Sequence, residues 1–359
     1  MMSIGGLSSR YDGWRRGPAL FVIAVLSLAL FAACWQPAGG STPAPKLRAT
    51  VTQGSDLELY RAIVKGVSDG GNYYEVAAAE QRAWSYPLKP FTTFRLPTQA
   101  MLYATVGEGP MIVLLWSLCA VMMWAWWRRL KPLMPPLQAG AALVFVAGGI
   151  GGILQPVTGF FHESWAAILL ALMIAIYRRE RAWPAMIAGG AALMMRELAL
   201  PMILLMGCCA LVGKRWREAA GWAGIVALFA AYMTLHAHWV SEVVRPSDPP
   251  SPGWLGLNGL QFALKSIAMV TMGISMPTAL ASAWIILSLF GWLSLRKGWA
   301  LVAGLMLLGY GVLLALFART DTFYWALIPA PFAFAGSAFL PNAFADLAKA
   351  IRRVPEQAA

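Results

Sequence analysis

Runs of apolar residues long enough to cross a lipid bilayer recur along almost the whole of this 359-residue chain. The hydrocarbon core of a bilayer is about 30 Å thick, and a helix of roughly 20 residues spans it because each residue adds about 1.5 Å. The runs lie at 18–35, 108–127, 137–154, 160–177, 218–236, 278–295, 298–317 and 323–341. The sequence therefore predicts an all-α polytopic membrane protein.

The composition agrees with this prediction and excludes several other classes of protein. Apolar residues make up 59% of the chain and charged residues 12%, and the mean hydropathy is +0.62. Soluble domains have about 45–50% apolar and about 25% charged residues. A soluble enzyme, a disordered scaffold and a protein with a nucleic-acid partner are therefore excluded. We expect residues 1–359 to form a single membrane domain.

The segment 183–213 has a different pattern from the long apolar runs. Two apolar arms of about 13 residues each meet at the motif Arg196-Glu-Leu-Ala-Leu-Pro201. Each arm is too short to cross a core of about 30 Å comfortably. We therefore expect a hairpin of two short helices, with its charged tip recessed in the membrane.

The apolar segment 256–274 also holds polar residues, among them Lys265. Counting this segment as a span would place Arg296 and Lys297 on the opposite side from the other basic clusters. We therefore expect an interfacial or re-entrant helix here. The eight long runs and the two arms of the hairpin then give about ten transmembrane helices.

Lys and Arg residues cluster beside one set of helix ends. With ten crossings, 17 of the 28 basic residues fall on this side together with five acidic residues, which accounts for the whole net charge of +12. Short cytoplasmic loops carry such an excess of Lys and Arg. The charge is therefore a signal of orientation, and it predicts that both termini are cytoplasmic.

The long loop at 36–107 then lies on the extracytoplasmic side. It begins with a flexible tether at 39–45, and the motif Ser55-Asp-Leu-Glu58 opens an amphipathic helix. A second helix is expected at about 73–84, and the proline-rich exit at 86–97 should be extended. We expect two helices that lie flat on the outer face of the membrane.

Polar side chains gather at the outer ends of the predicted spans. Ionisable groups inside a membrane are costly and usually functional. A proton or ion pathway would need such groups at several depths, whereas here they lie toward one side and favour a reaction centre open to the outside. They are His162, Glu163, Arg196, Glu197, His236, His238, Lys265, Arg319 and Asp321.

These features together resemble those of the glycosyltransferase C superfamily. The resemblance lies in a first helix, an outer loop of flat helices that opens with acidic residues, and many spans joined by short loops. The motifs on which it rests are Asp56-Leu-Glu-Leu-Tyr60, Gly71-Asn-Tyr-Tyr74, Tyr86-Pro-x-x-Pro-Phe91, Phe94-Arg-Leu-Pro97, His162-Glu-Ser-Trp165, Arg196-Glu-Leu-Ala-Leu-Pro201 and Arg319-x-Asp-x-Phe-Tyr-Trp325.

The resemblance implies an integral-membrane glycosyltransferase of bacterial cell-surface glycan assembly. Such enzymes take a sugar from a polyprenyl-phosphate donor and pass it to a glycan, lipid or polymer acceptor. The implied location is the bacterial inner membrane, with membrane lipids around the protein and the active site facing the periplasm. No cofactor is expected, and a divalent metal is not required, because the leaving group is a carrier monophosphate.

Asp56 resembles the general base of the superfamily, since it lies on the first outer loop close to the membrane. It would take the proton from the acceptor hydroxyl as that oxygen attacks the anomeric carbon. The alternative is a structural role, because Ser55 and Glu58 form a capping box and an acid suits the first turn of a helix. A single displacement without a carboxylate nucleophile predicts inversion at the anomeric centre.

Arg319 is a candidate to bind the carrier phosphate, and Lys265 is a second one. Arg319 forms a polar cluster with Asp321, which we include in the substrate-binding site, directly before Tyr324 and Trp325. The alternative for both cations is snorkelling, in which a long side chain reaches the membrane interface from within a helix.

His162 and Glu163 are candidates to position the acceptor or the sugar. The alternative is that they form a buried, hydrogen-bonded pair. Arg196 and Glu197 are also candidates for substrate binding, and the alternative is that they pair with each other at the hairpin tip.

Tyr73 and Tyr74 are candidates to stack on a sugar ring. His236 and His238 suggest a metal site, but residues two apart on a helix diverge by about 200°. We therefore expect no metal ligands.

Two other functions are consistent with parts of this pattern. A transporter or flippase of lipid-linked saccharide should show internal repeats and polar residues through the midplane of the membrane. A non-catalytic partner in a glycan-assembly complex should tolerate the substitution Asp56→Asn.

Overall fold

The computed structural model describes residues 9–35 and 56–353, and these residues form α-helices and short 3-10 helices without a β-strand. The prediction of an all-helical protein is therefore confirmed for this part of the chain. The longer helices are α1 (Arg16–Cys34), α5 (Glu108–Leu130), α10 (Trp216–Val243) and α13 (Gly298–Leu316). The other α-helices are α2 (Asp56–Ser68), α3 (Tyr73–Ala83), α4 (Pro97–Val106), α6 (Pro136–Gly149), α7 (His162–Ile176), α8 (Trp183–Met195), α9 (Leu200–Val212), α11 (Gly259–Met269), α12 (Thr278–Ser294) and α14 (Leu340–Arg352).

Among the described residues, four helices are long and apolar enough to cross a membrane, namely α1, α5, α10 and α13. A bent segment from 320 to 352 is a fifth candidate if its two parts count as one span. The helices α6, α7, α8, α9 and α12 are apolar but shorter. The protein thus has four or five candidate membrane spans, and the crossing of the shorter helices stays a prediction.

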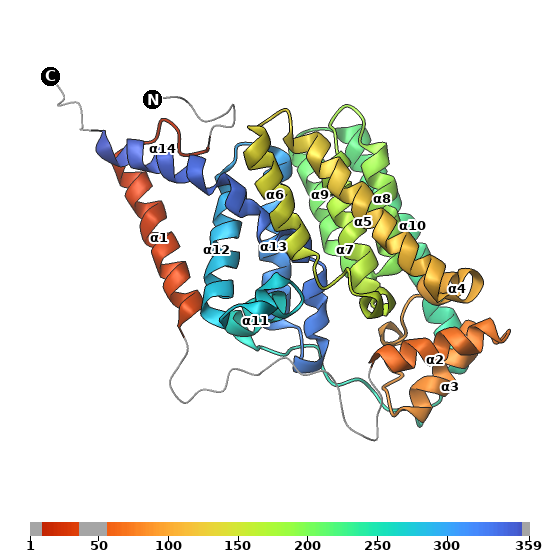
Figure 1. The fold of residues 1–359 in the computed structure, drawn as a ribbon. Helices are drawn as coiled ribbons and strands as arrows, with labels where there is room; N and C mark the ends of the chain where they lie inside the picture. Colours follow the sequence, from red (N-terminus) through yellow and green to blue (C-terminus); the bar gives the residue numbers. More distant parts are fainter. Residues whose placement is uncertain (1–8, 36–55, 354–359) are drawn as a thin grey trace.

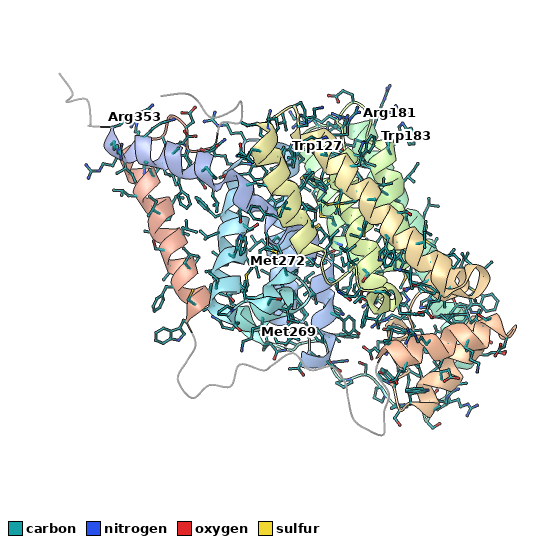
Figure 2. The ribbon with its side chains drawn as sticks, viewed as in Figure 1. Trp127, Arg181, Trp183, Met269, Met272 and Arg353 are labelled. Atoms are coloured by element: carbon teal, nitrogen blue, oxygen red, sulfur yellow. The ribbon has the colours of Figure 1, made fainter. Side chains whose placement is uncertain are left out.

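The helices lie side by side between two ends of the molecule (Figure 1). At one end, which we call the loop end, lie α2, α3, α4 and α11. At the opposite end α14 lies across the ends of α1 and α12. We call this the basic end, because Arg181 and Arg353 lie there (Figure 2).

Helix α7 lies at the centre of the bundle and packs against α5 and α8. It is apolar around its whole circumference, as is typical of a helix surrounded by other helices, and nearly all of its residues from His162 to Ala175 are buried. Because α7 begins at His162, its packing places the polar side chains of His162 and Glu163 in the interior at the loop end.

Helices α8 and α9 are separated at Arg196, whose backbone is extended with φ of −154° and ψ of 121°. The 3-10 helix η3 (Glu197–Ala199) follows, and α9 then returns toward the basic end. The side chain of Ile203 on α9 lies against Gly189 of α8, where an added Cβ would lie 2.7 Å from Cδ1 of Ile203. The charged motif at 196–197 lies beside the beginning of α7, since η3 contacts α7 and Arg196 pairs with Glu163.

The segment 256–274 contains α11, which has 11 residues, and the start of the 3-10 helix η4 (Met272–Ser275). Eleven residues extend over only about 16 Å. Helix α11 packs against α12 and α13 near the loop end (Figure 1).

The region expected as a regular helix at 323–341 differs from that expectation. It consists of the 3-10 helices η5 (Thr320–Leu327), η6 (Ala330–Phe332) and η7 (Ala335–Phe339), with a bend of 60° after η5. Proline residues at 329 and 331 remove backbone donors that a helix needs. The backbone of η7 also touches α12 so closely that a Cβ on Gly336 would lie 1.9 Å from the Ser288 carbonyl oxygen.

The described part of the outer loop contains α2, α3, the 3-10 helix η1 (Phe91–Thr93) and α4. Asn72 caps α3, since its side chain accepts a hydrogen bond from the Tyr74 amide at 2.9 Å. Apolar residues of α2 and α3 pack with Val240 of α10. The η1 turn interrupts the expected extended exit. The predicted tether at 39–45 and the capping residue Ser55 lie outside the described residues.

One further short 3-10 helix, η2 (Pro156–Phe160), connects α6 to α7. It contacts both α2 and α5. The loop helices therefore rest on the beginning of α7, and this contact brings Asp56 close to the buried polar groups of the bundle.

Candidate functional site

Two cavities of different character meet at the loop end. The first has a volume of about 80 Å³ and is lined by polar and aromatic side chains, including Asp56, Tyr60, Tyr73, Tyr86, Arg95, His162, Trp254, Arg319, Asp321 and Tyr324. The second has a volume of about 720 Å³ and is lined mainly by apolar groups of η2, α11, η4 and η5. Asp56, Asp321 and Tyr324 line both cavities.

The lining of the apolar cavity includes two methionines and two glycines. Met269 and Met272 (Figure 2) come from α11 and η4, and Gly151 and Gly152 come from the turn after α6. A Cβ on Gly152 would lie 2.3 Å from the Val270 carbonyl oxygen, so α11 can approach this turn only because the residue is glycine. The result is an apolar space beside a polar one.

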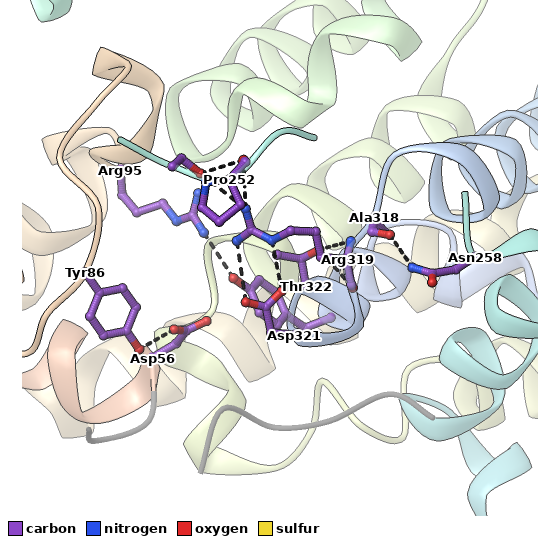
Figure 3. Close-up of polar contacts among 11 residues, drawn as sticks. Asp56, Tyr86, Arg95, Pro252, Asn258, Ala318, Arg319, Asp321 and Thr322 are labelled. Atoms are coloured by element: carbon purple, nitrogen blue, oxygen red, sulfur yellow. Dashed lines mark hydrogen bonds and ion pairs between the residues drawn. The ribbon is translucent and has the colours of Figure 1, made fainter. Parts of the chain in front are cut away.

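Asp56 is the first residue of α2, and its carboxylate accepts a hydrogen bond of 2.5 Å from the hydroxyl of Tyr86 (Figure 3). Tyr86 lies at the start of the proline-rich exit, so the loop itself orients the carboxylate. Among the described residues Asp56 forms no ion pair. Its charge is therefore available to a ligand.

Arg319 lies at the junction between α13 and η5, and its guanidinium contacts Asp321 and the segment 251–254. Nε is 3.1 Å from Oδ1 of Asp321, and the group lies 4.9 Å over the ring of Trp254. One terminal nitrogen donates to the hydroxyl of Ser251 at 3.2 Å. The side chains of Arg319 and Asp321 are 23% and 31% exposed, so this ion pair remains accessible from the cavity.

Ser251 and Trp254 belong to the segment after α10, which the sequence analysis did not assign to the site. The Ser251 amide donates to the Lys89 carbonyl oxygen at 2.6 Å, and this bond fastens the segment to the exit of the outer loop. Trp254 also stacks on Trp325 with ring centroids 5.6 Å apart. The indole ring thus forms an aromatic wall of the polar cavity.

Arg95 is the functional candidate that the sequence analysis missed. Nε donates to the hydroxyl of Tyr60 at 2.9 Å, and Nη2 donates to that of Tyr324 at 3.1 Å. Burial raises the pKa of Tyr60 to about 12, so this hydroxyl carries no charge near neutral pH. Within the described part of the chain Arg95 has no carboxylate partner.

The motif Phe94-Arg-Leu-Pro97 contains this cation, but the sequence alone gives it no role. A cation in a proline-rich segment at the membrane surface is ordinary. Only the fold shows that Arg95, Arg319 and the carboxylates of Asp56 and Asp321 converge on one space (Figure 3).

His162, Glu163, Arg196 and Glu197 lie together at the start of α7. Arg196, which is 1% exposed, pairs with Oε1 of Glu163 at 2.6 Å and also with Glu197. His162 lines the polar cavity, and its ring lies edge-on to Tyr60 with centroids 5.2 Å apart. Glu163, Arg196 and Glu197 line neither of the two cavities and form a paired group behind them.

Three other predicted site residues either line neither cavity or have hydroxyl groups that bond to other parts of the protein. Lys265 on α11 lines neither cavity. Tyr73 lines the polar cavity, but its hydroxyl donates to the Arg95 carbonyl oxygen at 2.7 Å and so supports that segment. Tyr74 faces α10, where its hydroxyl lies 3.2 Å from Nδ1 of His236.

The residues around the polar cavity can bind an anion, accept a proton and contact a sugar face. The two guanidinium groups provide charge-assisted donors, Asp56 provides a proton acceptor, and Trp254 provides an aromatic surface. No group of three or more metal-ligating side chains occurs in the part of the chain that the structure describes.

Comparisons of this chain with protein-family models, with curated proteins and with solved structures found no match. The function is therefore inferred from the residues and geometry of the site.

Proposed function

We propose that the protein is a membrane glycosyltransferase that transfers a sugar from a polyprenyl-phosphate donor to a glycan, lipid or polymer acceptor. The observation on which the proposal depends is the meeting of an apolar and a polar cavity at Asp56, Asp321 and Tyr324. A donor of this class has the same two parts, a long apolar chain and a charged sugar-phosphate end. It is favourable to bury the apolar chain in the apolar cavity and to bind the charged end in the polar cavity.

In this proposal the first part of the polyprenyl chain occupies the apolar cavity, and its phosphate lies between Arg95 and Arg319. Arg95 has no carboxylate partner among the residues that the structure describes, whereas the charge of Arg319 is partly offset by Asp321. Arg95 is therefore the stronger phosphate ligand, and the Arg319–Asp321 pair sets the position of the second cation. The sugar then lies against Trp254.

Asp56 acts as the general base. It takes the proton from the acceptor hydroxyl while that oxygen forms a bond to the anomeric carbon. The bond from the anomeric carbon to the phosphate oxygen breaks at the same time, and its electron pair leaves with the carrier phosphate. The guanidinium groups stabilise this growing negative charge. One displacement inverts the anomeric centre.

The proposed setting is the bacterial inner membrane, with ten crossings, both termini in the cytoplasm and the loop end in the periplasm. Its support is the arrangement in Figure 1, where α6, α7, α8, α9 and α12 lie alongside the longer helices between the same two ends. The segment from η5 to α14 extends from the loop end to the basic end and would be the last crossing. An excess of Lys and Arg favours the cytoplasm for the basic end.

The test is sugar transfer by the purified protein from synthetic polyprenyl-phosphate sugars. General-base catalysis contributes about 100-fold or more to such rates, so Asp56→Asn should lower kcat by at least that factor. Arg319→Ala should lower kcat/KM by about 10-fold to 100-fold. Asp69→Asn is the matched control, because Asp69 is exposed at the far end of α2 and lines neither cavity.

Tyr86→Phe separates the two roles of Asp56, since it removes the hydrogen bond but keeps the carboxylate. It should retain much more activity than Asp56→Asn. Unchanged transfer in both Asp56→Asn and Arg319→Ala would reject the site. Movement of the intact donor across liposomes without sugar transfer would instead support the flippase alternative.

A further inference from the structure

A third cavity lies at the basic end, away from Asp56. It has a volume of about 800 Å³ and lies between α9 and α13, below the turns that follow α7, α9 and α12. Among the described residues, one carboxylate, that of Glu180, and six cations line it, and these cations are Arg129, Arg178, Arg179, Arg215, Arg296 and Lys297.

The charges of these cations are poorly compensated by the protein. Within the described residues only Arg215 of the six forms an ion pair, with Glu218 at 2.5 Å. Arg129 donates to the Ala175 carbonyl oxygen at 2.6 Å and lies over the ring of Trp299. Like charges gathered around one space repel one another, and an anion bound among them removes this repulsion.

The walls of the cavity are apolar, in contrast to its rim. On α9 the lining residues Leu205, Cys209 and Val212 fall on one helical face, and on α13 the wall includes Leu301 and Val302. Val212 is 86% exposed, so the wall opens to the surface of the bundle. An anion with an apolar tail matches this arrangement, whereas a small inorganic anion would use only the rim.

We propose that this cavity binds an anionic phospholipid, with the phosphate among the cations at the rim and an acyl chain between α9 and α13. Orientation in the membrane requires cations on this side. It does not require that cations from four separate parts of the chain converge on one cavity with apolar walls. The proposal is independent of sugar transfer and of the cavities at the loop end.

The test is lipid binding by the full-length protein in detergent, measured by native mass spectrometry with phosphatidylglycerol and with phosphatidylcholine of the same acyl chains. Phosphatidylglycerol should bind at least about tenfold more tightly. The double variant Arg179→Gln/Lys297→Gln should weaken its binding about 30-fold, since each cation near an anionic lipid contributes about a fivefold factor. Both side chains are exposed and form no hydrogen bond in the described structure, so folding should be unaffected.

The matched control is Arg352→Gln/Arg353→Gln, which removes two exposed cations from the same end but not from the cavity. Its binding of phosphatidylglycerol should stay within twofold of the unsubstituted protein. Equal binding of the two lipids, or equal loss in the two double variants, would overturn the proposal. Displacement of the lipid by inorganic phosphate at the same concentration would also overturn it, because the ligand would then be a free anion.

Discussion

Arg95 and Arg196 are guanidinium groups at the same end of the bundle, but their charges are balanced differently. Arg196 is almost fully buried between two carboxylates, those of Glu163 and Glu197. A buried charge is tolerated when it is paired. The ion pairs of Arg196 are therefore sufficient to account for its burial, without a ligand. Among the described residues, the guanidinium of Arg95 donates to the hydroxyls of Tyr60 and Tyr324 and forms no ion pair. An anionic ligand bound beside Arg95 would balance the positive charge of its guanidinium.

Substitution of Arg95 by Gln should weaken the binding of polyprenyl phosphate by about 10-fold to 100-fold, because a hydrogen bond to a charged group contributes about 1.5–3 kcal/mol. Arg95→Lys should recover only part of the affinity, since an ammonium cannot reproduce the planar fork of a guanidinium. The dissociation constant is measured by titration of the purified protein.

Arg61→Gln is the control for this measurement. Arg61 is a half-exposed cation of α2 that pairs with Glu108, and it lines neither cavity. Its loss should leave the affinity within twofold. An unchanged affinity in Arg95→Gln, together with a lower melting temperature, would make Arg95 a structural residue that only holds Tyr60 and Tyr324 in place.

At the scale of elements, the loop helices are attached to the bundle by an apolar contact and by an ion pair. Leu59, Ile63 and Tyr73 pack in one cluster with Val240 of α10. At the other side of α3, Nε and Nη2 of Arg82 donate to the two carboxylate oxygens of Asp248 at 2.9 and 2.7 Å. This bidentate pair fixes the segment that continues to Trp254.

The ion pair predicts a pH dependence of stability. Hydrogen bonds from Arg82 lower the pKa of Asp248 to about 2, whereas an unfolded Asp has a pKa of about 3.9. The stabilisation is therefore complete above pH 4 and is lost as the pH falls toward 2. We expect a contribution of about 1 kcal/mol, because the Arg82 side chain is 25% exposed and water screens the pair.

The measurement is thermal unfolding in a non-ionic detergent between pH 6 and pH 2. Asp248→Asn should melt below the unsubstituted protein at pH 6, and the two melting temperatures should converge near pH 2. Asp69→Asn should follow the unsubstituted protein at every pH, since Asp69 is an exposed residue without an ion pair in the described structure. A constant difference between Asp248→Asn and the unsubstituted protein would exclude the pair as its cause.

At the scale of the whole molecule, the two ends of the bundle differ in chemistry. The loop end combines carboxylates, cations and aromatic groups around the small polar cavity. The basic end has six cations around a larger cavity, and among the described residues one of the six, Arg215, forms an ion pair. The two ends are well separated, so each can be assigned to one side of the membrane by experiment. This assignment tests the proposed topology directly.

Single cysteine substitutions in a cysteine-free background provide that test. Lys65 on α2 and Glu180 in the turn after α7 are both exposed. A thiol reagent that cannot cross membranes should label Lys65→Cys in intact spheroplasts and Glu180→Cys only after permeabilisation. Both variants should be labelled in detergent. Labelling of the two positions from the same side would contradict the proposed topology.

The sequence by itself determined the helical class of the protein and several residues of the polar cavity. Asp56, His162, Arg319 and Asp321 were candidates from their types and positions, and all four line that cavity. Such features are local, because the apolar character of a run and the acidity of a first helical turn depend on neighbours in the chain.

Only the tertiary structure decided which distant groups meet. Arg95 contacts Tyr324 across 229 positions of sequence, and the guanidinium of Arg319 lies over Trp254 from the segment after α10. The close backbone contact between Gly336 of η7 and Ser288 of α12 likewise joins residues that are distant in the sequence. These contacts result from packing between segments that are remote in the chain, and the pattern of any one segment does not contain them.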